Sequence, residues 1–220
     1  MTAEKIWALV QQGTIDTLYM TIPSAFFAYL LGLPLGILLV ITQKGHIKAN
    51  PAFNASLGSV VNFLRSIPFI ILLVMLFPVT RFVMGSAIGT RSIIFPLVIS
   101  AFPYVARMVE NSLNEVDHGL IEAAQSMGSS TMEIILKVLL PEALPSLVNG
   151  AAICVTTILA YTAMAGAAGG DGLGKIAITY GLNRREYGVM YAASVALVLL
   201  VQIIQMIGTW LTQALDHKRR

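Results

Sequence analysis

The sequence predicts an all-α protein that crosses a membrane about five times. Of its 220 residues, 56% are hydrophobic and only 11% are charged, and the mean hydropathy is +0.78. Soluble domains carry about 25% charged residues, so this chain has too few charges to cover a soluble protein of its size. Several runs are long enough to cross a bilayer as a helix, which takes roughly 20 apolar residues. We therefore expect one polytopic transmembrane domain over residues 1–220.

Five segments have the length and composition of membrane-spanning helices. The first three each contain two prolines, which such helices tolerate because neighbouring helices satisfy the freed carbonyls. The only charges inside the segments are Arg65 and Arg107. Arg65 is expected to pair with an acid such as Glu110 or Glu115, or to extend towards the inner headgroups. The expected spans are residues 18–41, 57–80, 93–109, 147–168 and 187–211.

The first 16 residues are mixed in character. Their apolar side chains fall on one helical face, which favours a helix lying along the membrane interface. We expect no cleavable signal peptide, because the apolar run that begins near Leu18 is too long for a signal-peptide core. The residues on this face are Ile6, Leu9, Val10 and Gly13.

An odd number of spans places the two termini on opposite sides of the membrane. The densest positive cluster, DHKRR at 216–220, favours a cytoplasmic C-terminus and hence an outside N-terminus. Lys44 and Lys48 then lie inside, as the rule expects. The rule is not followed throughout, because five other cations would lie outside: Arg81, Arg91, Lys175, Arg184 and Arg185.

The long connection at 110–146 has the features of an ordered loop. Asp117 can cap a helix over 119–127, with Leu120, Ala124 and Met127 on one face. Gly128 ends that helix. Loops longer than about 12–15 residues are usually functional or disordered, and the capping signals favour order.

A second short helix follows in the same loop. Ser130 and Glu133 have the spacing of a capping box, and Pro141 is expected to stop the helix. Neither of the two helices is long enough to cross a membrane.

These loop residues also carry a family resemblance. The segment EAAQSMG at 122–128, followed nine residues later by VLLP, resembles the EAA motif of ABC importer permeases, E-A-A-x3-G-x9-I-x-L-P. The segments FLRSIPFIILLV, ARMVENSLNEV, KVLLPEALPSLVNG and GGDGLGKIA resemble the methionine ABC importer permease family in the same order. Val138 stands at the isoleucine position. The matching positions are Glu122, Ala123, Ala124, Gly128, Leu140 and Pro141.

The resemblance implies a type I ABC importer permease fold, in a bacterial inner-membrane homodimer of five-span subunits. It implies that 110–146 is a cytoplasmic coupling loop that docks on separate ATPase subunits, and that an extracytoplasmic methionine-binding protein delivers the substrate. The cargo would be L-methionine, with D-methionine or related amino acids as further substrates. A short helix with small residues suits insertion into a partner's groove, and Glu122 can anchor it by a charge-assisted hydrogen bond.

No enzyme site is evident in the sequence. His46, His118 and His217 are not at metal-ligand spacing, and we expect neither a cofactor nor nucleic-acid binding. Gly169-x4-Gly174-Lys175 approaches a nucleotide-binding loop but lacks the following Ser or Thr, so it favours a glycine-rich outer turn where the backbone can approach a partner closely. The spans hold essentially no Asp or Glu, which argues against ion-coupled transport.

Two residues are candidates for lining a substrate path. Tyr161 and Met164 are three positions apart and therefore share a helical face. A thioether and a phenol suit an apolar amino acid in transit, but the same pattern also fits ordinary helix packing, because small residues surround both. A membrane scaffold that only binds a soluble partner through 119–145 is the alternative to an importer.

Overall fold

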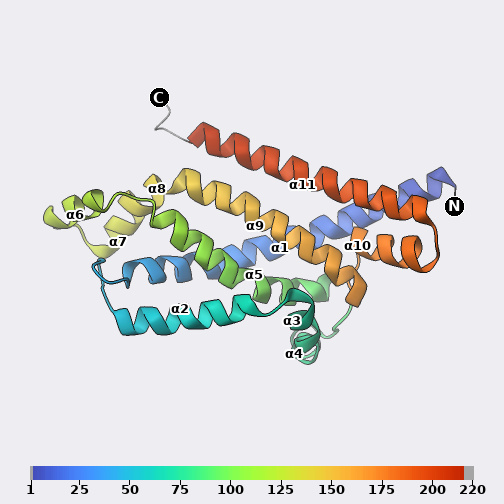
Figure 1. Ribbon diagram of the computed structural model, residues 1–220, viewed down its shortest axis with the longest axis horizontal. Helices are drawn as coiled ribbons and strands as arrows, with labels where there is room; N and C mark the ends of the chain where they lie inside the picture. Colours follow the sequence, from blue (N-terminus) through green and yellow to red (C-terminus); the bar gives the residue numbers. More distant parts are fainter. Residues whose placement is uncertain (1, 216–220) are drawn as a thin grey trace.

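The computed structural model describes residues 2–215 as a bundle of helices (Figure 1). Within this range every regular element is helical, which confirms the all-α prediction. The positive cluster at 216–220 and His217 lie outside the described residues. In chain order the elements are α1 (Ala3–Ile41), α2 (Pro51–Ser66), α3 (Phe69–Met75), α4 (Phe77–Met84), α5 (Thr90–Leu113), α6 (His118–Ser126), α7 (Thr131–Ile134), the π-helix η1 (Ile135–Leu139), α8 (Leu140–Glu142), α9 (Leu144–Ala165), the 3₁₀-helix η2 (Gly166–Ala168), α10 (Leu173–Ile176), the π-helix η3 (Ala177–Asn183) and α11 (Tyr187–Leu215).

Four of the described helices are long and apolar enough to cross a membrane: α1, α5, α9 with η2, and α11. A fifth crossing exists if α2 and α3 count as one broken span. Two connections, the α1–α2 loop and the segment α6–α8, lie at the same end of the bundle as the end of α11 (Figure 1). The start of α1 lies at the opposite end (Figure 1).

The first helix is longer than the sequence suggested. α1 has 39 residues, about 58 Å at 1.5 Å per residue, and the expected interfacial helix forms its first turns. The expected apolar face is present, but it packs against other helices of the chain and not along the membrane interface. Ile6, Leu9 and Val10 pack against the cluster Leu173, Ile176, Val189 and Ala193 of α10 and α11.

The expected span at 57–80 is not one helix. α2 ends at Ser66, and α3 leaves it at an angle of 94°. Pro68 lacks an N–H and disfavours a helical conformation at the residue before it, and Ile67 is extended with φ −79° and ψ 121°. The expectation of a single helix over 57–80 is therefore corrected. The prolines inside α1 and α5 lie within continuous helices, whereas Pro68 lies between two helices.

The most extensive helix contact within residues 2–215 joins α1 to α5. Gly32 and Gly36 are one turn apart on the buried face of α1. A Cβ at Gly36 would lie 2.6 Å from the Cβ of Val109 and 2.7 Å from the carbonyl oxygen of Ala106. A Cβ at Gly32 would lie 2.6 Å from the Cβ of Val105. Only glycine lets the two backbones approach this closely.

Near the loop end, a buried ion pair connects three elements. Arg107 donates to Glu110 at 2.6 Å and to the Gly58 carbonyl of α2 at 2.8 Å. Gln43, just after α1, donates to the second oxygen of Glu110 at 3.2 Å. Glu110 is 8% exposed, so its charge depends on these donors. The network ties α5 to α2 and to the α1–α2 loop.

At the opposite end, Asp171 joins two loops. Its carboxylate accepts hydrogen bonds from the backbone N–H of Thr90 at 3.0 Å and from its hydroxyl at 2.9 Å, and pairs with Lys175 at 2.6 Å. Although burial alone raises the pKa of Asp171, the bonds from Lys175 and Thr90 lower it overall. Asp171 thus caps α5, whose own N-cap residue is Gly89.

The glycine-rich stretch that resembles a nucleotide-binding loop has a packing role within the chain. Gly172 has φ +90°, and a Cβ there would lie 2.6 Å from the Thr17 hydroxyl. That hydroxyl accepts a hydrogen bond from the Leu173 N–H at 3.0 Å. The close backbone approach expected at this turn is therefore made to α1.

Gly36→Ala is expected to lower the stability of the fold by about 1–3 kcal/mol, the usual cost of overpacking a tight contact, because the new methyl group meets the backbone of α5. The measurement is thermal unfolding of the detergent-solubilised protein. Gly188→Ala in α11 is the matched control, since its Cβ would meet only the Ile6 Cδ1, at 3.9 Å. Equal melting temperatures for both variants would contradict the role given to the α1–α5 contact.

Candidate functional site

The helix α6 lies at the end of the molecule, beyond the last turns of α1 and α5 (Figure 1). The Asp117 carboxylate accepts a hydrogen bond from the Gly119 N–H at 2.6 Å and caps the helix, as expected. Ile121 and Ala124 are buried and join the main core cluster. Glu122 and Ala123 are exposed on the other side of the helix.

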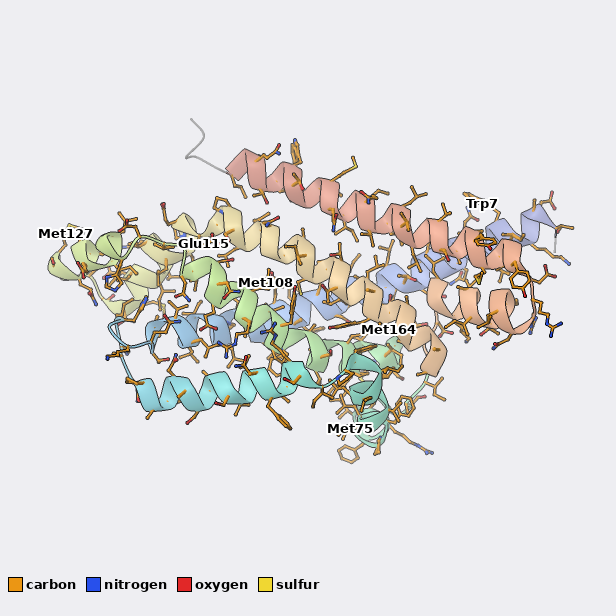
Figure 2. The ribbon with its side chains drawn as sticks, in the orientation of Figure 1. Trp7, Met75, Met108, Glu115, Met127 and Met164 are labelled. Carbon is orange, nitrogen blue, oxygen red and sulfur yellow. The ribbon has the colours of Figure 1, made fainter. Side chains whose placement is uncertain are left out.

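The three residues that the sequence places on one face of α6 differ in burial. Ala124 is buried, whereas Leu120 and Met127 are 45% and 80% exposed. Because a helix turns about 100° per residue, burial of Ile121 rotates Leu120 outward. Met127 lies near the far end of the molecule (Figure 2).

Gly128 ends α6 in a Schellman motif. Its N–H donates to the Gln125 carbonyl at 2.9 Å, and the Ser129 N–H donates to the Ala124 carbonyl at 3.1 Å. Gly128 has a positive φ of +80°, as is common for a glycine that ends a helix, and a Cβ there would meet nothing within 4 Å. A larger residue at this position would therefore be strained by its backbone conformation, with no crowding inside the chain.

The capping box that starts the second helix is confirmed. The Ser130 N–H donates to Glu133 at 3.0 Å, and the Glu133 N–H donates to the Ser130 hydroxyl at 3.4 Å. Lys137 pairs with Glu133 at 3.1 Å. The hydrogen bonds from the Ser130 backbone and hydroxyl, followed by those from Lys137, lower the pKa of Glu133 to about 2.

The second helix does not stop at Pro141, which corrects the sequence-based expectation. The chain passes from α7 through η1 and α8 into α9 with only Ala143 between the last two elements. In η1 the hydrogen bonds are of the π type, and the Leu140 N–H donates to the Ile135 carbonyl. The wider turn accommodates Pro141, which has no N–H to offer. This half of the loop is thus a direct extension of α9.

The predicted coupling residues fall into two places. Glu122, Ala123 and Gly128 lie on the outer surface of α6, whereas Ala124 is buried beneath them. Leu140 and Pro141 lie in α8, just before α9. Besides Leu120 and Met127 on α6, the loop exposes Met132 of α7 and Leu136 of η1, two apolar side chains that sequence reasoning missed.

Two histidines meet beside Glu122. The rings of His46 and His118 are 5.5 Å apart in a T-shaped arrangement, and the His118 Nδ1 lies 3.2 Å from Glu122. Burial and then the neighbouring His118 lower the pKa of His46, whose Nδ1 is buried without a hydrogen-bond partner. Among residues 2–215, no three His, Cys, Asp or Glu side chains are grouped to hold a metal ion.

Tyr161 and Met164 have different neighbours on α9. The Tyr161 ring stacks on Phe69 of α3 with centroids 4.6 Å apart and planes 5° apart. Met164 is 52% exposed and lines an apolar groove of about 850 Å³ between α9 and α11, which Ile70 of α3 also lines. Two adjacent residues of α3 thus lie beside these two positions of α9: Phe69 stacks on Tyr161, and Ile70 lines the same groove as Met164.

Arg65 does not pair with Glu110 or Glu115. Its guanidinium lies over the ring of Tyr104 in α5, 5.6 Å from the centroid, while Glu110 is held by Arg107. At the centre of a membrane-spanning helix an arginine costs about 2.5–3.5 kcal/mol, and a cation–π contact returns about 0.5–2 kcal/mol. The contact with Tyr104 alone therefore does not offset the burial of this charge in a membrane.

Comparison with known proteins gives consistent matches. The sequence model of the family described as "Binding-protein-dependent transport system inner membrane component" matches residues 32–220. The chain is 47% identical over 210 residues to the probable D-methionine transport system permease protein MetI of Vibrio cholerae, covering 96% of this chain and 93% of that protein. It is 49% identical over 166 residues to the D-methionine transport system permease protein MetI of Escherichia coli K12, covering 76% of each.

A solved structure has nearly the same fold. A chain from the inward-facing MetNI methionine ABC transporter superposes with a TM-score of 0.96 at 46% identity. The match covers 99% of this chain and all of that chain.

Acidification is expected to destabilise the packing of α6 against the α1–α2 loop, because His46 of that loop contacts His118 of α6. Its lowered pKa means that the folded state binds a proton less readily than the unfolded state. The stability contribution is therefore complete above about pH 6.5, the unfolded value, and is lost as the pH falls below it. The measurement is the melting temperature at pH 7.5 and pH 5.5, for the wild type and for His46→Gln. The variant should lose less stability on acidification, and an identical decrease in both would contradict the role of His46.

Proposed function

Because the chain belongs to the family of inner membrane components of binding-protein-dependent transport systems, we propose that it is the permease subunit of an ATP-driven importer of methionine or closely related amino acids. The observation that carries the proposal is the capped, glycine-terminated helix α6, which exposes Glu122 and Ala123 of the EAA segment and buries Ala124 against the core. ATP hydrolysis then takes place on a separate subunit, and the chain itself is not an enzyme. Family membership favours this function over a scaffold without transport activity.

In this proposal α6 is the coupling helix. Glu122 and Ala123 are exposed beside the apolar side chains of Leu120 and Met127, a surface suited to a groove on the ATPase. Ala124 has an indirect role, because it is buried in the main core cluster and holds α6 against the rest of the protein. Leu140 and Pro141 belong to the helical connection into α9, which can carry a displacement of the loop to Tyr161 and Met164.

The proposed orientation has the N-terminus outside and the C-terminus in the cytoplasm. ATP is cytoplasmic, so a coupling loop must face that side. The α1–α2 loop and the end of α11 lie at the same end as α6, and the start of α1 lies at the other (Figure 1). Lys44 and Lys48 agree with this orientation by the positive-inside rule.

The complete importer contains two copies of this chain with two ATPase subunits and an extracytoplasmic methionine-binding protein. One copy is too small to enclose a gated path. In the most apolar window of α11 only 6% of the residues are buried, which leaves a long surface for lipid or a second copy. Tyr161 and Met164 are proposed to line the path between the copies.

Orientation is tested by labelling intact cells with an impermeant thiol reagent. The protein's single cysteine, Cys154, is buried and is replaced by alanine as the background. Glu4→Cys is expected to react from outside, whereas Lys44→Cys is expected to react only after the membrane is opened. Labelling of position 44 alone in intact cells would reverse the proposed orientation.

Methionine uptake into proteoliposomes tests the function. The permease, its ATPase and its binding protein should take up labelled methionine only when ATP is supplied. Glu122→Lys is expected to reduce both ATPase copurification and uptake at least tenfold, because it inverts the charge on the docking surface. Glu115→Lys makes the same charge change at an exposed position outside α6 and should retain both (Figure 2). A scaffold would bind a soluble partner without ATP-dependent uptake.

A further inference from the structure

Within the described part of the chain, Arg65 is a cation without an ion-pair partner, in the bent helix pair α2–α3, which is long and apolar enough to form one broken membrane span. It occupies the last turn of α2, just before the bend into α3. Its side chain is exposed and contacts the face of Tyr104. Among residues 2–215, no ion pair includes Arg65, and Glu110, the acid that it was expected to bind, is held by Arg107 and Gln43.

The position of Arg65 along α2 excludes an extension to the inner headgroups. α2 begins at Pro51, beside the α1–α2 loop that the proposed orientation places in the cytoplasm, and Arg65 lies 14 residues later, about 21 Å along the helix axis. A single side chain cannot span that distance. An intramembrane charge of this kind is retained where it faces a hydrated path or a ligand.

The neighbours of Arg65 change from polar to apolar in one direction. Tyr161 lies within electrostatic range of both Arg65 and Tyr104, and it stacks on Phe69. The next residue of α3, Ile70, lines the apolar groove that Met164 also lines. A guanidinium, a pair of stacked rings and an apolar groove with a thioether therefore follow one another across α2, α3 and α9, and Met164 lies at the end of α9 near α3 (Figure 2).

We propose that Arg65 binds the carboxylate of the amino acid in transit, while the groove beside Phe69 and Tyr161 receives its apolar side chain. A guanidinium can grip a carboxylate through two parallel hydrogen bonds, which a lysine cannot reproduce. Tyr104 holds the guanidinium in place when no substrate is present. The inference rests on the proposed import function and names the residue that recognises the common part of the substrate.

Substrate protection of a cysteine in the groove tests the site directly. Ala160 lines the groove, and Ala160→Cys in a Cys154→Ala background is labelled with N-ethylmaleimide in the solubilised complex of permease and ATPase. L-Methionine at up to 50 mM is expected to slow labelling. Methioninol, which keeps the side chain and the amine but lacks the carboxylate, is expected to protect at least tenfold less well. No protection by methionine, or equal protection by both compounds, would overturn the proposal.

The arginine variants identify the residue responsible. In the Arg65→Gln variant, methionine should protect the cysteine at position 160 from labelling at least tenfold less well, and no better than methioninol does. In the Arg65→Lys variant, both the protection by methionine and its advantage over methioninol should remain below the wild-type level. Arg81→Gln is the matched control, since it removes an exposed charge from α4. If methionine protects the Arg65→Gln variant from labelling as well as it protects the wild type, Arg65 does not bind the carboxylate.

Uptake measurements separate this inference from the proposed function. Arg65→Gln should still copurify with the ATPase and hydrolyse ATP in the presence of the binding protein, while methionine uptake falls at least tenfold. Normal uptake by Arg65→Gln would overturn the inference and leave the import function intact. Loss of ATPase copurification would give Arg65 a structural role instead and would also overturn it. Absence of methionine uptake by the wild type would refute the import function itself.

Discussion

The contact between α1 and α5 through Gly32 and Gly36 positions the other functional parts of the protein. The two backbones are so close that a methyl group at either glycine would meet the side chain and backbone of α5. Because the contact is made by backbone atoms, it fixes both the distance and the relative rotation of the helices. α5 in turn places Tyr104 beside Arg65, and Arg107 and Glu110 beside α2. α5 also sets the position of the loop that begins after Leu113, because the loop continues directly from the end of this helix.

The polar interactions at the two ends of α5 secure this arrangement. At the loop end, Glu110 is buried and bound by Arg107 and Gln43, so removing one partner would leave an unpaired charge. At the other end, Asp171 caps the helix from a distant loop. Each interaction joins α5 to a different segment of the chain, and each satisfies a group that an apolar environment would otherwise penalise.

The connection between the loop and α9 has a mechanical consequence for the proposed importer. α6 ends in a sharp turn at Gly128, but from α7 onwards the chain is almost continuously helical into α9. A helix resists bending more than a loop does, so a force on this part of the loop can reach Tyr161 and Met164. The π-helix η1 lies in this connection, and irregularities of this kind often occur at functional sites. The residues on α9 that are proposed to line the path, and the part of the loop from α7 onwards, thus belong to one nearly continuous helical element.

The sequence by itself determined the fold class, the capping signals and the family resemblance. Each of these depends on composition or on residues close together in the chain, such as Asp117 with Gly119 or Ser130 with Glu133. The tertiary structure decided which residues meet across long distances. Arg65 faces Tyr104 rather than an acid, because Pro68 bends the chain and α5 passes beside it. Leu120 and Met127 are exposed, because Ile121 packs on the core, and Pro141 lies within a helix, because a π-turn accommodates it. Local patterns specify hydrogen bonds between near neighbours, but contacts between distant segments depend on how the helices pack.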